Sequence, residues 1–311
     1  MTAPRPQLLM GLSILAAVLN LALKSVAYRV TGSVGLLADA GESVVNVVAA
    51  LAALLTLVYA ARPVDRDHTY GHEKIEYFSS GLEGMLILVA ACAIVWFALR
   101  RLFVPEELES LGVGSGFTFA ATVINLGVGL LLIRAGRRAQ SIVLEADGRH
   151  LMADVVTSAG VLLGLGLVWL TKLTWLDTIV ALLVAGHIGW TAIDLIRRSF
   201  DGLMDRALPE EEQAKVRAAI AGLLAPGMDF HALRTRRAGT RRFADFHLLV
   251  PGIFTVRRAH EITERIEKAI RVALPDMEVT VHVEPIEERA AWEDSALVPL
   301  EQAARQARGE V

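Results

Sequence analysis

Long apolar runs constrain this fold more than any other feature of the sequence. Six of them lie near residues 8–28, 34–59, 78–103, 112–134, 142–171 and 175–196. A helix needs about 20 apolar residues to cross about 30 Å of hydrocarbon. Hydrophobic residues make up 54% of the 311 residues, which is too apolar for a soluble globular chain. We therefore expect residues 1–204 to form an α-helical membrane bundle of six transmembrane helices.

Basic residues near the ends of the runs predict the orientation of this bundle. One side collects Arg5, Arg62, Arg66, Lys74, Arg134, Arg137, Arg138, Arg197 and Arg198. The other side has only Arg29, Arg100, Arg101 and Lys172. Because cytoplasmic loops carry the excess of lysine and arginine, we expect a multi-pass protein of the inner or plasma membrane with both termini cytoplasmic.

The remainder of the chain has regularly spaced charge and is typical of a soluble domain. We expect helices over 210–224 and 255–272, and strands over 233–237, 243–250 and 277–284. This order predicts a small cytoplasmic α+β domain over 205–290, with an αββαβ, ferredoxin/metallochaperone-like arrangement. Residues 291–311 are rich in alanine, glutamate and arginine, and we expect a flexible tail there.

Several functional classes are disfavoured by composition. The formal net charge of −3 provides no basic field for nucleic acid. Cys92 is the single cysteine, which excludes an internal disulfide framework and a cysteine-based zinc site. The apolar runs offer no nucleophile with an adjacent base, and no glycine-rich nucleotide loop is present. We therefore expect neither an enzyme nor an organic cofactor.

Two of the apolar runs each carry a polar stripe. The residues are Asp39, Glu42 and Asn46 in the second run, and Asp147, His150 and Asp154 in the fifth. The spacing i, i+3, i+7 places each set on one helical face. An ionisable residue at the bilayer centre costs roughly 2.5–3.5 kcal/mol, so these faces should point toward each other or toward a wet cavity.

The depth of the two stripes predicts that they meet. At about 1.5 Å per residue, Glu42 and Asp154 lie about 12 and 18 Å from opposite faces of the membrane. Because the two helices run antiparallel, Glu42 should lie level with Asp154, and Asn46 level with His150. Four mixed nitrogen and oxygen donors suit tetrahedral Zn²⁺, with Fe²⁺, Mn²⁺, Co²⁺ and Cd²⁺ as other candidates.

Two points stay open at this stage. The two stripes could instead form a hydrogen-bonding patch that holds the helices together. Asp39 and Asp147 could orient the ligands or line the entrance to the site, without binding the ion themselves.

Four segments resemble the cation diffusion facilitator family, of the proton-coupled zinc and iron efflux type. They read "TGSVGLLADAGESVVN", "PVDRDHTYGHEKIE", "ADGRHLMADV" and "LMDRALP". The resemblance covers nearly the whole chain and implies a membrane-embedded homodimer that exports a divalent cation. It implies transport ligands at Glu42, Asn46, His150 and Asp154. Asn46 departs from the family's usual aspartate and removes one negative charge from the site.

A second set of candidate ligands follows the second run, where Asp65, His68 and His72 fall within eight residues. By spacing alone they indicate either a weak metal site or a solvated loop. The family resemblance implies a peripheral ion at these positions. It also implies that Lys74 and Asp205 form a salt bridge that holds the dimer together near the membrane surface. The alternative is that they are two solvated loop charges.

The third candidate set lies in the soluble domain. It consists of His231, His247, His260, His282 and Glu284. His282 and Glu284 are two residues apart on a predicted strand, so they share one face. These residues are either surface histidines of a small domain or, as the resemblance implies, ligands of a binuclear regulatory site where two cytoplasmic domains meet.

Two functions are consistent with these observations. Ligands shed protons to bind metal, so a site that contains Glu42, His150 and Asp154 couples metal occupancy to proton occupancy. This favours a divalent metal cation:proton antiporter that exports Zn²⁺ from the cytoplasm, with zinc or a similar ion as substrate and regulator. The alternative is a membrane-anchored metal sensor whose membrane site is structural and which moves no ion.

Overall fold

The computed structural model describes the whole chain except residues 1–5, 32–33, 104–112, 172–174 and 294–311. It divides into two compact units, Met1–Leu203 and Met204–Val311. In its described part the first unit consists of six helices. They are α1 (Pro6–Thr31), α2 (Val34–Ala60), α3 (Ile75–Phe103), α4 (Val113–Ala139), α5 (Ile142–Thr171) and α6 (Trp175–Leu203).

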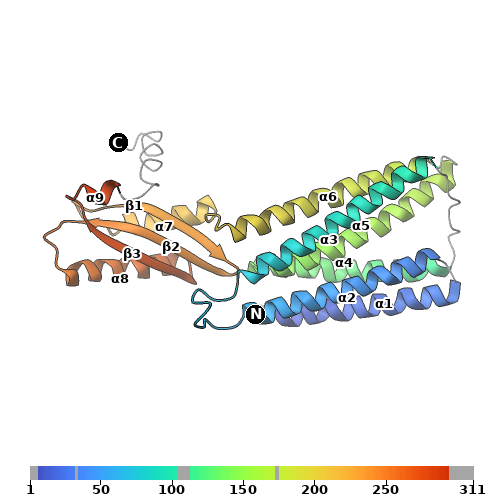
Figure 1. The fold of residues 1–311 in the computed structure, drawn as a ribbon, viewed down its shortest axis with the longest axis horizontal. Helices are drawn as coiled ribbons and strands as arrows, with labels where there is room; N and C mark the ends of the chain where they lie inside the picture. Colours follow the sequence, from blue (N-terminus) through green and yellow to red (C-terminus); the bar gives the residue numbers. More distant parts are fainter. Residues whose placement is uncertain (1–5, 32–33, 104–112, 172–174, 294–311) are drawn as a thin grey trace. The chain divides into compact units, whose positions relative to one another are not determined.

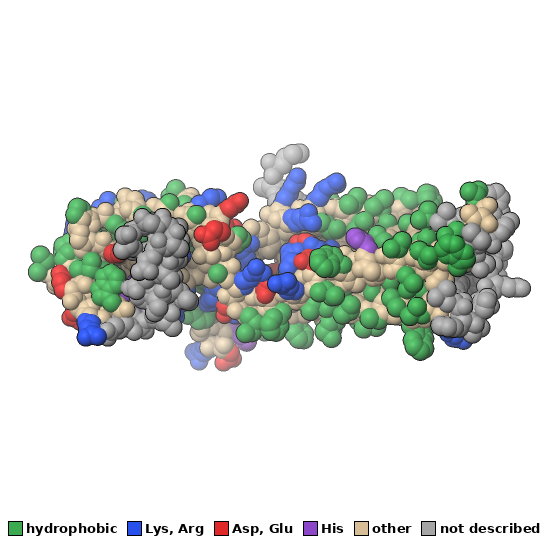
Figure 2. All heavy atoms as spheres, turned by 90° about the horizontal axis from the view of Figure 1, so that it is seen from above, with side chains coloured by type: hydrophobic (Ala, Val, Ile, Leu, Met, Phe, Trp, Pro, Cys, Tyr) green, Lys and Arg blue, Asp and Glu red, His purple; other side chains and the backbone are tan. Residues whose placement is uncertain are grey.

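The six helices run alongside one another, with α3 packed on α6, α4 on α5 and α1 on α2 (Figure 1). Large hydrophobic side chains, among them Leu55, Val89 and Trp190, are exposed on the outer surface of this unit. Figure 2 shows hydrophobic atoms covering much of one side of the bundle. An apolar outer surface of this kind suits lipid, because the helices satisfy their backbone hydrogen bonds internally.

Among the described residues, four helical stretches are long and apolar enough to cross a membrane. They are Pro6–Arg29, Ile75–Arg100, Phe119–Ala139 and Thr178–Leu203. In α2 the described apolar part is shorter and covers Asn46–Ala60. α5 is interrupted by the charged and polar residues of its first half. The two helices that carry the predicted stripes therefore differ from the other four.

Glycines let α4 and α5 approach closely. A Cβ atom added at Gly148 would lie 2.9 Å from the carbonyl oxygen of Gly129, and one added at Gly136 would lie 2.7 Å from the backbone nitrogen of Glu145. Small residues at such contacts allow helix backbones to pack directly. This close packing brings polar residues of α4 within reach of α5.

The second unit contains a three-stranded sheet with helices packed on it. Its elements are α7 (Glu210–Ala221), β1 (Asp229–Ala238), β2 (Arg241–Val250), α8 (Val256–Ala273), β3 (Met277–Pro285) and α9 (Ala290–Glu293). The sheet order is β1-β2-β3, with β1 antiparallel and β3 parallel to β2. The side chain of Thr255 caps α8 by accepting from the backbone N–H of Arg258. Gly239, with φ of 56°, begins the two-residue turn between β1 and β2.

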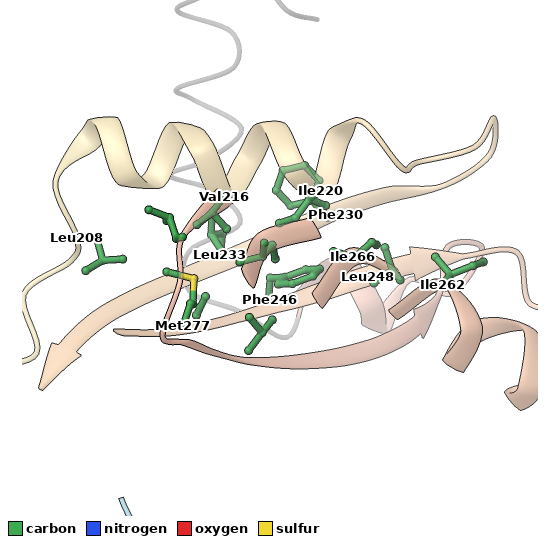
Figure 3. Close-up of a cluster of buried hydrophobic side chains, with 14 of the residues drawn as sticks. Leu208, Val216, Ile220, Phe230, Leu233, Phe246, Leu248, Ile262, Ile266 and Met277 are labelled. Atoms are coloured by element: carbon green, nitrogen blue, oxygen red, sulfur yellow. The ribbon is translucent and has the colours of Figure 1, made fainter. Parts of the chain in front are cut away.

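One buried hydrophobic cluster holds the second unit together (Figure 3). Ile262, Ile266 and Ile270 follow one another at four-residue spacing along α8, so they share the helix face that packs on the sheet. Phe246 and Leu248 of β2 point into the same cluster. Because side chains alternate along a strand, His247 between them points to the opposite face of the sheet. The hydrophobic core therefore leaves the other sheet face available for polar residues.

Candidate metal sites

The polar stripes of α2 and α5 meet at Asn46. Nε2 of His150 lies 2.9 Å from Oδ1 of Asn46, and Nδ2 of Asn46 donates to Oδ2 of Asp154 at 2.8 Å. Asn46 is buried, with 8% of its surface exposed. It was predicted to lie level with His150, and in the structure it contacts both His150 and Asp154 of α5. The side chains of Glu42 and Asp39 lie outside the described part of the structure.

The geometry indicates what a cation would replace. The Asn46 carboxamide joins His150 to Asp154, so their three donor groups already converge within hydrogen-bonding distance. For Oδ1 of Asn46 to accept from His150, the Nε2 atom of that imidazole must carry a proton. A metal ion takes the unprotonated nitrogen and an ionised carboxylate. A cation bound by these three groups would therefore replace the hydrogen bonds with metal bonds and would displace the Nε2 proton.

Two asparagines outside the predicted stripes, Asn20 and Asn125, also belong to this region. Asn125 of α4 lies with Nδ2 3.5 Å from Oδ2 of Asp154. The side-chain amide of Asn20 in α1 donates to Oδ1 of Asn125. Both asparagines are buried, and together they connect α1 and α4 to Asp154. Each is a lone amide in an apolar run, and that unexplained polarity was the only sequence signal.

Asp147 lies one helical turn before His150 on the same helix face. It is 3% exposed, and its Oδ2 accepts from the Ser13 hydroxyl of α1 at 2.5 Å. Within the described residues, Asp147 is hydrogen-bonded to Ser13 and not to Asn46. Asp147 thus lies beside the predicted ligands, toward the end of the bundle where α5 begins.

Charged residues near this end of α5 form a cluster with α6. Arg198 donates from two nitrogens to the carboxylate of Glu145, each at 2.8 Å. Arg149 donates to Glu145 from Nη2 and to Asp194 from Nη1, each at 2.8 Å. These two arginines connect α5 to α6, and Arg137 of α4 also lies near Glu145, with Nε 3.7 Å from Oε1. No sequence signal indicated this cluster, because its α5 members, Glu145 and Arg149, are far along the chain from its α6 members.

The loop between α2 and α3 brings Asp65, His68 and His72 together, with one donor atom from each lying within 4.8 Å of the others. Oδ2 of Asp65 is 3.2 Å from Nε2 of His72, and Oδ1 is 3.1 Å from Nδ1 of His68. The backbone N–H of His68 donates to Asp65, and this hydrogen bond holds the pKa of the Asp65 carboxyl below its usual value. Asp65 therefore stays ionised to a lower pH than an ordinary aspartate.

His72 differs from the other two loop residues in its burial. Its side chain is 2% exposed, and its ring packs edge-on against Tyr59 of α2. Nδ1 of His72 has no hydrogen-bond partner within the described residues. A buried imidazole nitrogen without a partner is costly, so a ligand for this ring would stabilise the loop.

In the second unit, strand register aligns three histidines in one row across the sheet. His231 of β1 pairs with His247 of β2, and His247 pairs with His282 of β3. Their ring centroids are 5.1 and 5.0 Å apart along the row. A β-bulge follows His231, where Ala232 has φ of 52°. The bulge shifts the register of the strand immediately after this row.

Glu284 connects these histidines. Its Oε2 lies 3.2 Å from Nε2 of His231 and 3.2 Å from Nδ1 of His247, and its Oε1 lies 3.4 Å from Nε2 of His282. Side-chain exposure rises along the row from 4% at His231 to 21% at His247 and 66% at His282. The cluster is thus buried at β1 and open at β3.

Comparisons with known proteins decide the family. Residues 10–204 match the cation efflux transmembrane domain, and residues 208–286 match the cytoplasmic domain of cation efflux proteins. The chain belongs to the cation diffusion facilitator family. It is an integral membrane cation efflux transporter of that family.

Relatives of this cation diffusion facilitator align along most of its length. An uncharacterized transporter of Synechocystis sp. is 44% identical over 91% of this chain and 91% of its own length. The cation-efflux pump FieF of Shewanella oneidensis is 32% identical over 88% of this chain and 92% of its own length. A solved metal-bound C-terminal domain of the CzcD transporter from Thermotoga maritima is 32% identical, covers 26% of this chain and 99% of that chain, and has a TM-score of 0.23.

Two predictions for this cation diffusion facilitator concern residues outside these clusters: His260, and the salt bridge between Lys74 and Asp205. His260 lies on α8 with its side chain 68% exposed, 3.5 Å from Glu264 of the same helix. Within the described residues it is not one of the side chains that gather at Glu284. Lys74 lies in the first unit, whereas Asp205 lies in the second, 3.5 Å from Arg236. The salt bridge between Lys74 and Asp205 stays a prediction.

Proposed function

We propose that this transporter is a divalent metal cation:proton antiporter that exports Zn²⁺ from the cytoplasm. The observation that carries the proposal is the hydrogen-bonded set of His150, Asn46 and Asp154 between α2 and α5. The six helices of the first unit would all span the membrane, with both termini cytoplasmic. Glu42 would complete the ligand set from the same face of α2.

Proton coupling follows from the ligands. An imidazole and a carboxylate bind a metal ion only after they release their protons, so protons and Zn²⁺ compete for one site. Where protons are abundant, the site releases the ion. An inward proton gradient would therefore drive Zn²⁺ outward without a nucleotide.

The imidazole of His150 favours zinc among the candidate cations. Zinc accepts nitrogen ligands readily, whereas Mn²⁺ depends more on anionic oxygens. Asn46 offers a neutral amide oxygen in place of a carboxylate. We therefore expect the transporter to prefer Zn²⁺ over Mn²⁺, with Fe²⁺, Co²⁺ and Cd²⁺ as further substrates.

Flux measurements in vesicles test this function. The purified protein is reconstituted with a zinc-sensitive dye inside, and Zn²⁺ uptake is followed with and without a pH difference across the membrane. We expect uptake that saturates with zinc and speeds up when the lumen is acidic. A variant with the exposed substitution His260→Ala serves as the matched control and should transport normally. Protein that binds zinc but moves none would instead support the membrane-anchored sensor.

The cytoplasmic cluster is proposed as a regulatory zinc site shared by two protomers. If zinc binds at His231, His247 and Glu284, and His282 contacts an ion at the interface of a homodimer, then zinc stabilises the paired domains by mass action. We expect amide hydrogen exchange in residues 277–285 to slow when zinc is added to metal-free protein. Glu284→Ala should abolish this protection, and His260→Ala should preserve it. Identical exchange with and without zinc would refute the regulatory site.

A further inference from the structure

The chain turns back onto the sheet directly after β3. The backbone N–H of Ile286 donates to the carbonyl oxygen of Val250 at 2.9 Å. The carboxylate of Glu287 accepts from the backbone N–H of Gly252, also at 2.9 Å. These hydrogen bonds attach the segment after β3 to the end of β2. The short helix α9 follows, and it lies beside β1 (Figure 1).

α9 places Trp292 against the buried end of the histidine row. The indole of Trp292 and the imidazole of His231 meet edge-on, with ring centroids 5.6 Å apart and an angle of 72° between the ring planes. Nε1 of Trp292 donates to the carbonyl oxygen of Ile286 at 3.1 Å. The polar end of the indole is thus held by the backbone of its own segment, while its ring packs on His231.

The imidazole of His231 lacks the hydrogen bond that usually orients a metal ligand. A histidine that binds a metal donates its second ring N–H to a carboxylate, a carbonyl or water, and this bond fixes which nitrogen faces the ion. In His231, Nε2 lies 3.2 Å from Oε2 of Glu284, whereas Nδ1 is buried and has no hydrogen-bond partner among the residues that the structure describes. Because Nδ1 does not anchor the ring within this part of the chain, the ring orientation depends on packing.

Two ring contacts supply this packing. The ring centroid of His247 is 5.1 Å from that of His231, with an angle of 65° between the planes, and Trp292 makes the second contact. Edge-on pairs favour a defined orientation, because the positive edge of one ring meets the negative face of the other. His247 is itself a candidate ligand. Of the two contacts, Trp292 is therefore the one that offers no ligand atom and orients His231 from outside the donor set.

The donor set fits a zinc ion. One donor atom from each of His231, His247 and Glu284 lies within 4.8 Å of the others, and imidazole nitrogens with a carboxylate are ligands that Zn²⁺ accepts. We propose that Trp292 is a positioning residue of this cytoplasmic site. Its ring holds the His231 imidazole with Nε2 toward Glu284 and thereby sets how tightly zinc is retained. This inference rests on the proposed regulatory site.

Hydrogen exchange at graded free zinc concentrations measures the affinity of this site separately from the membrane sites. The readout is the free zinc concentration that gives half-maximal protection of β3 in full-length protein that is metal-free at the start. We expect Trp292→Ala to raise this concentration by about tenfold or more, which is the usual effect of removing a group that orients a metal ligand. Trp292→Phe keeps an aromatic ring on His231 and should restore most of the affinity.

A core variant separates positioning from a general contribution to stability. Ile270 is fully buried on the other side of the sheet, in the hydrophobic core. Ile270→Val removes one methylene there, so it should lower the unfolding temperature and leave the zinc midpoint unchanged. An unchanged midpoint in Trp292→Ala would overturn the proposal, whatever its unfolding temperature. Absence of zinc protection in the wild type would instead refute the regulatory site, and the role of Trp292 with it.

Fluorescence keeps the test decisive if Trp292→Ala fails to fold. Bound Co²⁺ quenches a nearby indole, and comparison with Trp292→Phe isolates the emission of Trp292 from that of the other tryptophans among the five in the chain. We expect Co²⁺ to quench this emission in the full-length protein. His231→Ala should abolish the quenching, and the exposed substitution His260→Ala should preserve it. Emission from Trp292 that Co²⁺ leaves unchanged, or quenching that survives His231→Ala, would equally overturn the proposal.

Discussion

Asp154→Ala is expected to reduce zinc flux to the level of protein-free vesicles while leaving a folded dimer. Asp154 is the carboxylate at the centre of the predicted site, where it accepts from Asn46 and lies 3.5 Å from Nδ2 of Asn125. Its removal takes one anionic ligand away from the site, so that the imidazole of His150 has one fewer negative charge beside it to hold the ion. Zinc flux in vesicles measures the loss, and size-exclusion chromatography verifies the dimer.

Asp154→Asn is the matched control for this experiment. The asparagine side chain has nearly the same shape and can still accept hydrogen bonds, but it carries no charge. If charge is what holds the ion, Asp154→Asn should lose transport as fully as Asp154→Ala while unfolding at nearly the wild-type temperature. Normal zinc flux in either variant would disprove the assignment of the transport site.

The second large effect is expected from Asn46→Asp. The substitution places a carboxylate where the amide now donates to Asp154, 2.8 Å away. With a divalent cation between them, the two carboxylates both gain an attractive partner. We expect affinities for Zn²⁺ and Mn²⁺ to rise by about tenfold or more, which corresponds to about 1.4 kcal/mol. The gain should be greater for Mn²⁺, because it depends more on anionic oxygens, so the preference for zinc narrows.

The pH dependence of Asn46→Asp provides a further check. In metal-free protein the two carboxylates would repel, and a proton between them would relieve the repulsion. Protons should therefore compete more strongly with the metal, and the apparent zinc affinity should fall more steeply with acidification than in wild type. Both proteins must be compared at the same pH. If transport affinities for zinc and manganese are both unchanged, the ion is held by Glu42, His150 and Asp154, with water or Asp39.

Helix periodicity explains why part of the candidate transport site could be predicted from the sequence. The spacing of Asp147, His150 and Asp154 places them on one face of α5 whatever surrounds the helix, because that spacing is a local property. Because ionisable groups are energetically costly in lipid, this face of α5 needs a polar face of another helix beside it. Asn46 of α2 lies on that second face. The apolar runs and the family motifs are local in the same sense, and they correctly predicted the family.

Tertiary packing decided which isolated polar residues join these stripes. Asn20 and Asn125 each stand alone in an apolar run, so no spacing rule connects them to Asp154. They reach it because glycines let α4 lie against α5, and a sequence does not state which glycines face each other.

The soluble domain shows the same division between local and long-range information. Alternation along β3 placed His282 and Glu284 on one face from the sequence alone. The position of His231 beside His247 depends on the register of β1 against β2 and on the bulge that follows at Ala232, both of which are long-range properties. His260 was grouped with them by residue type, yet its place on the exposed side of α8 keeps it apart. Sequence thus determined which side chains share an element face, and only the packing of distant elements determined which faces meet.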